Sequence, residues 1–266
     1  MTHFPHLFQP IELGGLEIRN RVIFGPHGTS QGRAPGTMPD LVAYHAARAQ
    51  GGVGLIITEA HTVHESYEVR NSLLAVSDDD AIPELREMAD VAHKHGAAMF
   101  GQLFHPGRAA AHRVNGALLP AYAPSEVPDE RHHVMPAPMS QAMIRDIIRS
   151  YGEGARRMAE AGLDGIEYMI SMGYLPAQFV NPRANVRTDE YGGSFENRLR
   201  FVRESLSAVR AGVDSTTVVG VRISVDELDH GGLSPDESIA ISKALADEGL
   251  IDYVNVIGGS GASVGG

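Results

Sequence analysis

The sequence contains no cysteine and no tryptophan among its 266 residues. Without cysteine the chain forms no disulfide, no thiolate metal site, no cysteine nucleophile and no iron-sulfur cluster of its own. No apolar run approaches the length that spans a membrane, and the N-terminus lacks the cationic start and apolar core of a secretion signal. We therefore expect a soluble protein of a reducing compartment, the cytoplasm.

Positive charge is also scarce. The 22 Lys and Arg against 33 Asp and Glu give a net charge of −11, so nucleic acid and anionic membranes are not expected partners. Hydrophobic residues make up 43% and charged residues 21%, which is ordinary for a globular protein and sufficient for one large domain. The expected partner is a small-molecule substrate, and the sequence leaves the oligomeric state open.

Short apolar runs alternate with segments of helical periodicity along the whole chain. The predicted strands are Arg21–Phe24, Val53–Thr58, Ala97–Phe104, Gly165–Ile170, Val218–Ser224 and Asp252–Ile257. The predicted helices are Leu41–Gln50 with Asp40 as cap, Asp80–His95, and three further helices that begin at the capping residues Ser140, Ser194 and Ser234. This alternation predicts a parallel sheet, either doubly wound or closed as a (β/α)8 barrel.

Polar residues follow strand after strand, which favours the α/β TIM barrel, because its reactive face is built from many βα loops. Only about the first six of the eight βα units are present. We therefore expect residues 1–266 to be a single barrel domain that is incomplete at its C-terminal end. The loop after Gly165–Ile170 and the proline-rich excursion at 105–140 are longer than connections require, and we interpret the excursion as a flap over a site.

Two histidines at 61 and 64 form an H-x-x-H pattern in a predicted βα loop. The pattern could bind a metal ion, but no carboxylate or cysteine at ligand spacing supports it. We favour a solvated loop or a substrate contact, and we predict no metal site.

Several longer motifs carry a family resemblance. The runs RNRVIFGPH, ARAQGGVGLIITEA, GQLFHPGR, EAGLDGIE, GYLPAQFVNPRANVRTDEYGGSFENRLRF and DHGGLSPDES occur in this order. They resemble the old yellow enzyme family of FMN-dependent NAD(P)H oxidoreductases, and more narrowly the branch that includes 2,4-dienoyl-CoA reductase and trimethylamine dehydrogenase. The resemblance covers essentially the whole chain.

The resemblance implies an FMN across the C-terminal mouth of the barrel, with NADH or NADPH as electron donor. Pro26 and His27 would pack on the isoalloxazine or offer it backbone groups, and Ala60 would lie beside its edge. Gln102 would hydrogen-bond the pyrimidine ring, and Arg222 would place positive charge by N1 and O2, where the reduced flavin gains negative charge. The structural alternatives are a buried amide and an ordinary ion pair.

Tyr174 is the implied catalyst, because the enone reductases of the family use a tyrosine at this place to protonate the substrate carbon opposite the one that receives hydride. The alternative is a tyrosine that packs the loop.

The chain departs from the family at three positions. Met169 and Met172 stand where many relatives carry histidines or His and Asn, and methionine donates no hydrogen bond to a substrate carbonyl. Gly28 stands where trimethylamine dehydrogenase carries its covalent flavin anchor, so FMN would be bound non-covalently. Without tryptophan, and with Met169 in place of a tyrosine, the aromatic cation site of that enzyme is not reproduced.

The first functional hypothesis is hydride transfer from a reduced nicotinamide to an α,β-unsaturated carbonyl or enoyl-type substrate. A second is oxidative N-demethylation of a methylated amine held by Met169 and Met172. A third is a non-catalytic fragment, or half of a split barrel. A 4Fe-4S cluster and FAD, as in the narrower branch, would belong to a missing C-terminal region.

Overall fold

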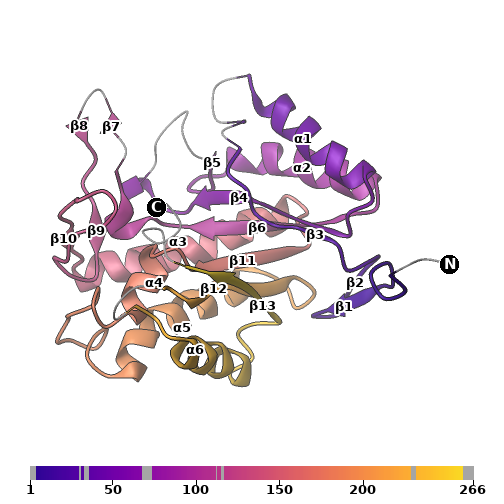
Figure 1. Ribbon diagram of the computed structural model, residues 1–266. Coiled ribbons are helices and arrows are strands. Elements are labelled where there is room, and N and C mark those ends of the chain that lie inside the picture. The colour runs from indigo at the N-terminus through magenta and orange to yellow at the C-terminus, as the bar shows by residue number, and fades with distance from the viewer. Residues whose placement is uncertain are drawn as a thin grey trace.

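The computed structural model of the chain describes residues 4–29, 31–32, 36–67, 74–111, 113–114, 117–228 and 232–259. Its centre is a curled sheet of parallel strands, with a short strand β5 (Leu74–Ala75) paired to β4 (Figure 1). Along the sheet the strands follow the order β13 (Tyr253–Gly258), β12 (Val218–Asp226), β11 (Gly165–Ile170), β6 (Ala98–Phe104), β4 (Leu55–Thr62) and β3 (Ile23–Phe24).

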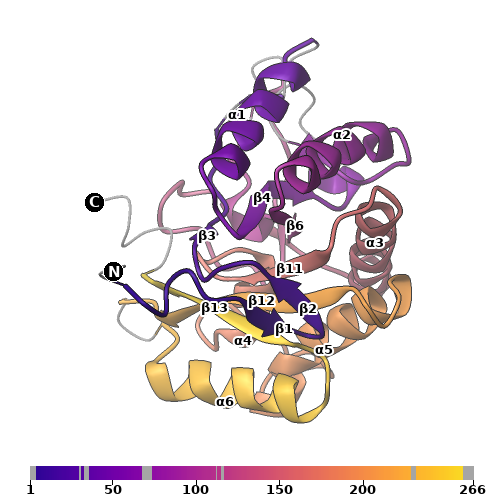
Figure 2. The same ribbon diagram turned by 90° about the vertical axis from the view of Figure 1, so that its right-hand side faces the viewer.

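Helices cover the outer side of this sheet, and Figure 2 shows them around it from α1 to α6. They are α1 (Met38–Gln50), α2 (Ala81–Lys94), α3 (Gln141–Glu160), α5 (Phe195–Gly212) and α6 (Pro235–Asp247). Six strands that alternate with helices and curl in one direction form the first part of a (β/α)8 barrel, as the sequence predicts. Within the described residues, β3 pairs only with β4 and β13 only with β12, so the sheet has two open edges.

Serine caps fix the starts of three helices as expected. Ser140 accepts a hydrogen bond from the backbone N–H of Met143, Ser194 does the same for Asn197, and Ser234 forms a full capping box with Glu237. The predicted cap Asp40 is wrong. Helix α1 begins at Met38 with Pro39 in its first turn, so Asp40 lies inside the helix. In this first turn the helix dipole stabilises a negatively charged carboxylate.

An N-terminal hairpin closes the amino end of the barrel and was not predicted. Strands β1 (Ile11–Leu13) and β2 (Leu16–Ile18) pair antiparallel around Gly14 and Gly15, which both have positive φ. Ile18 is buried in one interior cluster with Leu55, Ile57, Phe100 and Val218. The signal was present, because two short runs of alternating apolar residues around a Gly-Gly pair are typical of a hairpin.

Several segments that the sequence suggested to be loops contain regular structure. Strand β4 runs on to Thr62, so residues 59–62 belong to the strand. The long loop after β11 contains a short helix, α4 (Leu175–Val180), which is wholly buried. Two short 3-10 turns follow β4 and β6, at Glu65–Tyr67 and Gly107–Ala109. The excursion folds into the short strands β7 (Arg113–Val114), β8 (Ala117–Leu118), β9 (Tyr122–Ala123) and β10 (Ala137–Pro138).

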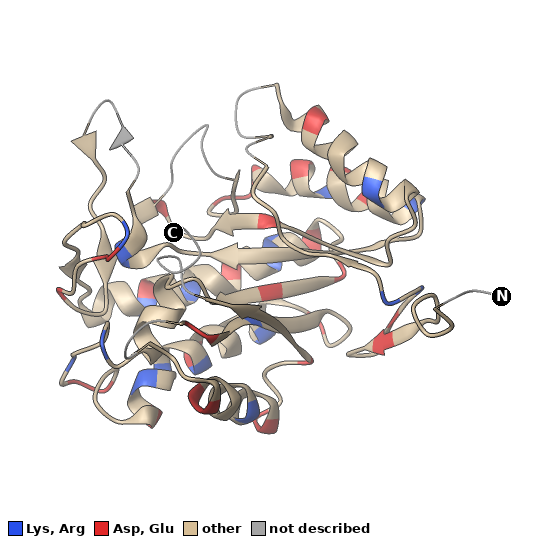
Figure 3. Cartoon of the chain, viewed as in Figure 1, with Lys and Arg blue, Asp and Glu red and all other residues tan. Residues whose placement is uncertain are grey.

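Charged residues lie mostly on helices and loops (Figure 3). Strands β4 and β11 each carry one acidic residue, Glu59 and Glu167, and both side chains are buried. A buried carboxylate is costly unless it is paired, so these two positions point to a polar site inside the barrel. None of the helices in the described ranges is both long enough and apolar enough to cross a bilayer.

Candidate flavin site at the carboxyl end of the sheet

Strand register brings four of the predicted site residues, together with Glu167, into two adjacent rows. In the first row Ala60 on β4 lies opposite Gln102 on β6, and Gln102 lies opposite Glu167 on β11. In the second row Met169 lies opposite Arg222. Residues directly opposite each other in a sheet point to the same face, and residues two apart along a strand do so as well. All five therefore project from one face, near the carboxyl ends of their strands.

A bulge in β4 makes this alignment possible. The pairing of β4 with β6 shifts between Ile57 and Ala60, so three residues of β4 span two of β6. An extra residue in one strand re-aims the side chains that follow it. Ala60, which the sequence placed in a loop, thus lies in the strand beside Gln102.

The loop after β3 reaches the same place. Pro26 is half-buried, and His27 and Gly28 are exposed. A Cβ built at Gly25 would lie 4.0 Å from Nη1 of Arg222, so the start of this loop faces that guanidinium. The hydroxyl of Thr29 donates to Glu59 at 2.6 Å and ties the far end of the loop to β4. Sequence analysis missed Thr29 and Glu59.

Gln102 and Arg222 both have unused hydrogen-bonding capacity. The amide nitrogen of Gln102 donates to Glu167 at 2.7 Å, while its oxygen receives no hydrogen bond within the described part of the chain. The Nε of Arg222 is buried and has no partner there either. A buried polar group such as this Nε is almost always paired in folded proteins. The Gln102 amide and the Arg222 guanidinium lie on β6 and β12, on either side of β11, and an acceptor and a cationic donor on one face of the sheet fit a bound polar ring such as the pyrimidine end of FMN.

Tyr174 caps the short helix α4 and lies in an apolar cluster. Its ring packs edge-on against Phe104, with 4.7 Å between the ring centroids. Met169 and Met172 belong to the same cluster. Burial raises the pKa of the Tyr174 phenol, the nearby Arg131 opposes this shift, and Asp129 adds to it. The phenol therefore keeps its proton at neutral pH.

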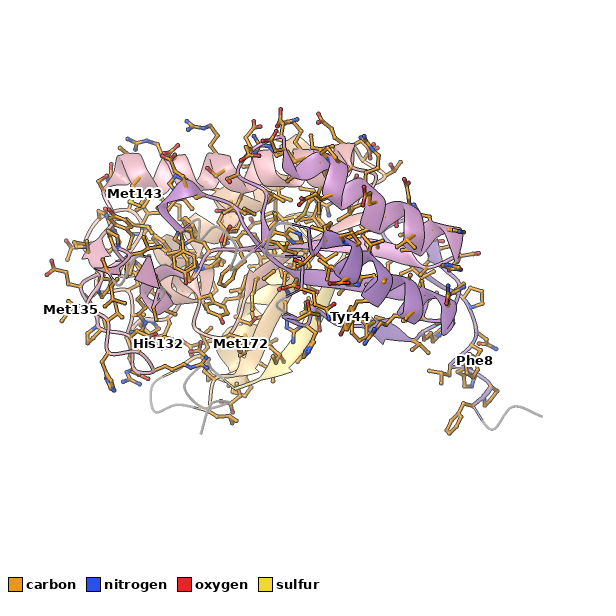
Figure 4. The ribbon with its side chains drawn as sticks, turned by 90° about the horizontal axis from the view of Figure 1, so that it is seen from above. Phe8, Tyr44, His132, Met135, Met143 and Met172 are labelled. Atoms are coloured by element: carbon orange, nitrogen blue, oxygen red, sulfur yellow. The ribbon has the colours of Figure 1, made fainter. Side chains whose placement is uncertain are left out.

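The turn that presents Tyr174 is unusual, because Met172 and Gly173 both have positive φ. A left-handed conformation is uncommon for a methionine and costs about 1–3 kcal/mol. The N–H of Met172 donates to Ser224 of β12 at 3.3 Å, and the N–H of Leu175 donates to the carbonyl of His105 at 3.0 Å. These contacts hold the turn between the ends of β6 and β12. In Figure 4, Met172 lies between His132 and Tyr44.

The two histidines of the H-x-x-H pattern do not form a solvated loop, so that interpretation is wrong. His61 lies in β4 and is 2% exposed. His64 is buried as well, and its Nδ1 lies 2.8 Å from the Ser66 hydroxyl and its Nε2 3.3 Å from a carboxylate oxygen of Asp146. No group of three or more His, Asp or Glu in the described ranges could hold a metal ion.

His64 belongs to a hydrogen-bonded chain that the sequence analysis did not find. The N–H of Gly107 donates to Nδ1 of His105, so Nε2 of His105 carries the proton and donates to Ser66 at 3.0 Å. The N–H of Ser66 likewise marks Nδ1 of His64 as an acceptor, which leaves Nε2 to donate to Asp146. Burial lowers the pKa of His105 to about 3, so its ring is neutral. His64, Ser66 and Asp146 line an outer pocket of about 960 Å³ under helix α3.

A family model matches most of the chain. The family described as NADH:flavin oxidoreductase / NADH oxidase matches residues 6–258. The chain belongs to this family. The family description names NADH and a flavin, which agrees with the FMN cofactor and the reduced nicotinamide that the resemblance implies. The open groups of Gln102 and Arg222 fit this cofactor.

Relatives extend the comparison. The chain is 37% identical over 254 residues to NADH oxidase from Thermoanaerobacter brockii, with 94% of the chain and 39% of that relative covered. It is 35% identical over 252 residues to a multifunctional alkene reductase/demethylase OYE from Caballeronia cordobensis, covering 94% of the chain and 36% of the relative. The chain thus spans less than two fifths of the length of these relatives.

A solved structure of morphinone reductase in complex with tetrahydroNAD superposes on the chain with a TM-score of 0.81. The two are 28% identical, and the match covers 95% of this chain and 73% of the other. The partial barrel and the family resemblance are therefore both confirmed.

Proposed function

We propose that this chain carries the flavin site of an FMN-dependent oxidoreductase that transfers hydride between a reduced nicotinamide and an α,β-unsaturated carbonyl or enoyl-type substrate. The observation that carries the proposal is the convergence of Gln102 and Arg222, each with an open hydrogen-bonding group, beside the apolar cluster of Tyr174. When bound, FMN would supply the two-electron chemistry of hydride transfer.

The roles of the remaining residues follow from their places. Pro26 and His27 would contact the ring from the loop after β3, and Ala60 would line its edge. Gly28 offers no side chain for a covalent link, so FMN would be held non-covalently. Arg222 would stabilise negative charge at the pyrimidine end.

Tyr174 would donate its phenolic proton to the substrate carbon. A general acid must hold its proton at the working pH, and the buried phenol does so. Met169 and Met172 would form the apolar wall against the substrate. Since neither donates a hydrogen bond, the substrate carbonyl would be activated by another donor.

Oxidative N-demethylation of a methylated amine is the second candidate. The methionine wall supports it, because a methylated amine needs an apolar surface but no hydrogen-bond donor. The printed name of one relative combines alkene reductase and demethylase. Turnover with enones but not with methylated amines would exclude this candidate.

We also propose that residues 1–266 form one FMN-binding barrel domain to which further βα units belong. The two open sheet edges and the longer relatives support this. A cytoplasmic location remains part of the proposal, and an oligomer is compatible with it. Any 4Fe-4S cluster or FAD would belong to a further region, because this chain has no cysteine.

The absorption spectrum of the purified chain before and after acid precipitation is the first test. A flavin band that moves into the supernatant would support non-covalent FMN, and panels of enones and methylated amines with NADH and NADPH would follow. A colourless chain that takes up no added FMN would contradict the proposal and favour the non-catalytic or split-barrel alternative.

A further inference from the structure

A buried carboxylate on β11 lies between the strands that carry Gln102 and Arg222. Glu167 is 0% exposed. One of its oxygens accepts from the amide of Gln102 at 2.7 Å, and the other accepts from Asn255 at 2.9 Å and from the hydroxyl of Tyr253 at 3.2 Å. Three donors from two strands converge on this carboxylate, which accepts from all of them. Burial raises the pKa of Glu167, and the hydrogen bonds from Asn255 and Gln102 and the charge of Arg222 oppose that shift.

The backbone is arranged to allow this convergence. Tyr253 belongs to β13, and β12 lies between that strand and Glu167. A Cβ at Gly220 of β12 would lie 2.1 Å from the Tyr253 ring. The Tyr253 ring therefore passes across β12 at Gly220, and a side chain at this position would clash with it.

The carboxylate determines the orientation of the Gln102 amide. An ionised carboxylate only accepts hydrogen bonds, so the NH2 group of Gln102 must face Glu167. The amide oxygen then points elsewhere, and it receives no hydrogen bond in the described ranges. The pyrimidine end of oxidised isoalloxazine has a single N–H donor, N3–H, between two carbonyl oxygens. An open acceptor is what that N–H requires.

We propose that Glu167 is a positioning residue of the flavin site, which turns the Gln102 amide so that its oxygen receives N3–H of FMN and which offsets the charge of Arg222. The proposal rests on the proposed function. Asn255 lies opposite Arg222 in the sheet and touches Glu167, so the carboxylate and the guanidinium share one polar cluster. Removing the carboxylate leaves the Arg222 cation uncompensated, which favours the more negative, reduced flavin.

The test compares three variants of the chain loaded with FMN. Glu167→Gln keeps the size of the side chain but removes its charge. The new amide can donate as well as accept, so the Gln102 amide is free to rotate by 180°. Glu167→Asp keeps the charge. Glu87→Gln on helix α2, which is exposed, removes the same charge far from the site and serves as the matched control.

Glu167→Gln should weaken FMN binding about tenfold, the effect of one lost hydrogen bond, and should shift the midpoint potential of bound FMN to more positive values. Glu167→Asp and Glu87→Gln should keep the potential of the wild type. In a double-mutant cycle with Gln102→Ala, the losses in FMN affinity should be less than additive, because Glu167 acts through Gln102.

The proposal is overturned if Glu167→Gln binds FMN within about twofold of the Glu87→Gln control with an unchanged potential, or if the losses of the two variants add. It is also overturned if Glu167→Asp shifts the potential as Glu167→Gln does. Failure of the wild type to bind FMN would instead contradict the proposed function.

A second readout needs no flavin. In the FMN-free chain, the side-chain NH2 resonances of Gln102, assigned by their loss in Gln102→Ala, should show a proton shifted downfield by the carboxylate and protected from exchange. Glu167→Gln should abolish both properties, and Glu167→Asp should retain the shift. Unchanged resonances in Glu167→Gln would overturn the role of Glu167 in orienting the amide.

Discussion

Tyr174 differs from the other tyrosines of the site region in its position, at the start of α4 and edge-on to Phe104. Tyr174→Phe should leave flavin reduction by the nicotinamide unchanged, because no proton from the phenol is needed in that step. Reoxidation by an enone should slow by at least about 100-fold, the usual contribution of a positioned general acid. Stopped-flow measurement of the two half-reactions separates these effects.

The matched control is Tyr44→Phe on helix α1, where the ring lies under the guanidinium of Arg48 at 3.3 Å and belongs to another apolar cluster than Tyr174. It should leave both half-reactions unchanged. Equal enone rates in the wild type and Tyr174→Phe would show that the tyrosine only packs the loop, the alternative that the sequence left open.

The hydroxyl of Ser66 contacts two buried histidines, and its removal should lower the free energy of unfolding. Ser66→Ala removes the hydroxyl that accepts from Nε2 of His105, while Nδ1 of His64 keeps its hydrogen bond from the backbone N–H of residue 66. An unpaired buried group costs about 1–3 kcal/mol, so we expect the free energy of unfolding to fall by about that amount. Urea titration measures it. A Ser66→Thr variant keeps the hydroxyl and should retain most of the lost stability, whereas equal losses in both variants would argue for a steric cause.

At the scale of the elements, the close contact between β12 and β13 makes a clear prediction. Gly220→Ala places a methyl group into the Tyr253 ring and should destabilise the chain by about 1–3 kcal/mol, the usual cost of overpacking. A Gly220→Ala/Tyr253→Ala double variant should lose less than the sum of the single losses. Thermal unfolding measures both.

Gly258→Ala is the control for this pair, because a Cβ there would meet nothing within 4 Å and the residue has an ordinary φ. It should unfold within about 0.5 kcal/mol of the wild type. Additive losses for Gly220 and Tyr253 would mean that the two residues do not share one steric contact.

The sequence predicted the elements better than it predicted their ends. Strand β11 and the serine caps were predicted correctly, because buried apolar runs and cap residues are local signals. The extension of β4 was missed, since its last residues are polar and only a neighbouring strand with a bulge satisfies them. Helix α4 was missed because its burial, and not its composition, stabilises six residues of helix.

The site residues also divide into those that the sequence predicted and those that only the packing of strands reveals. Gln102, Arg222 and Met169 were found because each lies near a strand end within a family motif. Glu167 and Tyr253 were missed, because their role depends on the register of three strands and on the absence of a side chain at Gly220. No periodicity within one strand contains that information. The roles assigned to the site residues remain predictions.

At the scale of the whole molecule, three buried histidines predict an acid-sensitive fold. Burial lowers the pKa of His45 and His61 to about 4 and that of His105 to about 3. An unfolded histidine titrates near pH 6.5, so below that pH the unfolded chain binds more protons than the native one. The free energy of unfolding that these neutral histidines contribute is fully present above pH 6.5 and is lost as the pH falls towards 4.

Each histidine should contribute a slope of about 1.4 kcal/mol per pH unit in this window. Urea unfolding between pH 7.5 and 4.5 measures the total slope. His61→Asn should reduce it by about one histidine's share, whereas His132→Asn, at an exposed position, should leave it unchanged. The half-exposed His93 has its pKa raised by Asp164 and acts in the opposite direction, but solvent screens that pair. A flat profile would show that the three rings are solvated.

The hairpin at the amino end of the barrel also bears on how the chain folds during synthesis. Ile18 leaves the ribosome before the rest of its interior cluster, and Val218 of that cluster follows 200 residues later. At roughly 5–20 residues per second, about 10–40 s separate the two. For that time the hairpin has no complete binding surface, and two strands are a marginal structure on their own. The hairpin is therefore made long before it can pack in its final place, so the nascent chain must keep the apolar side chains of the hairpin from other partners until β12 has been translated.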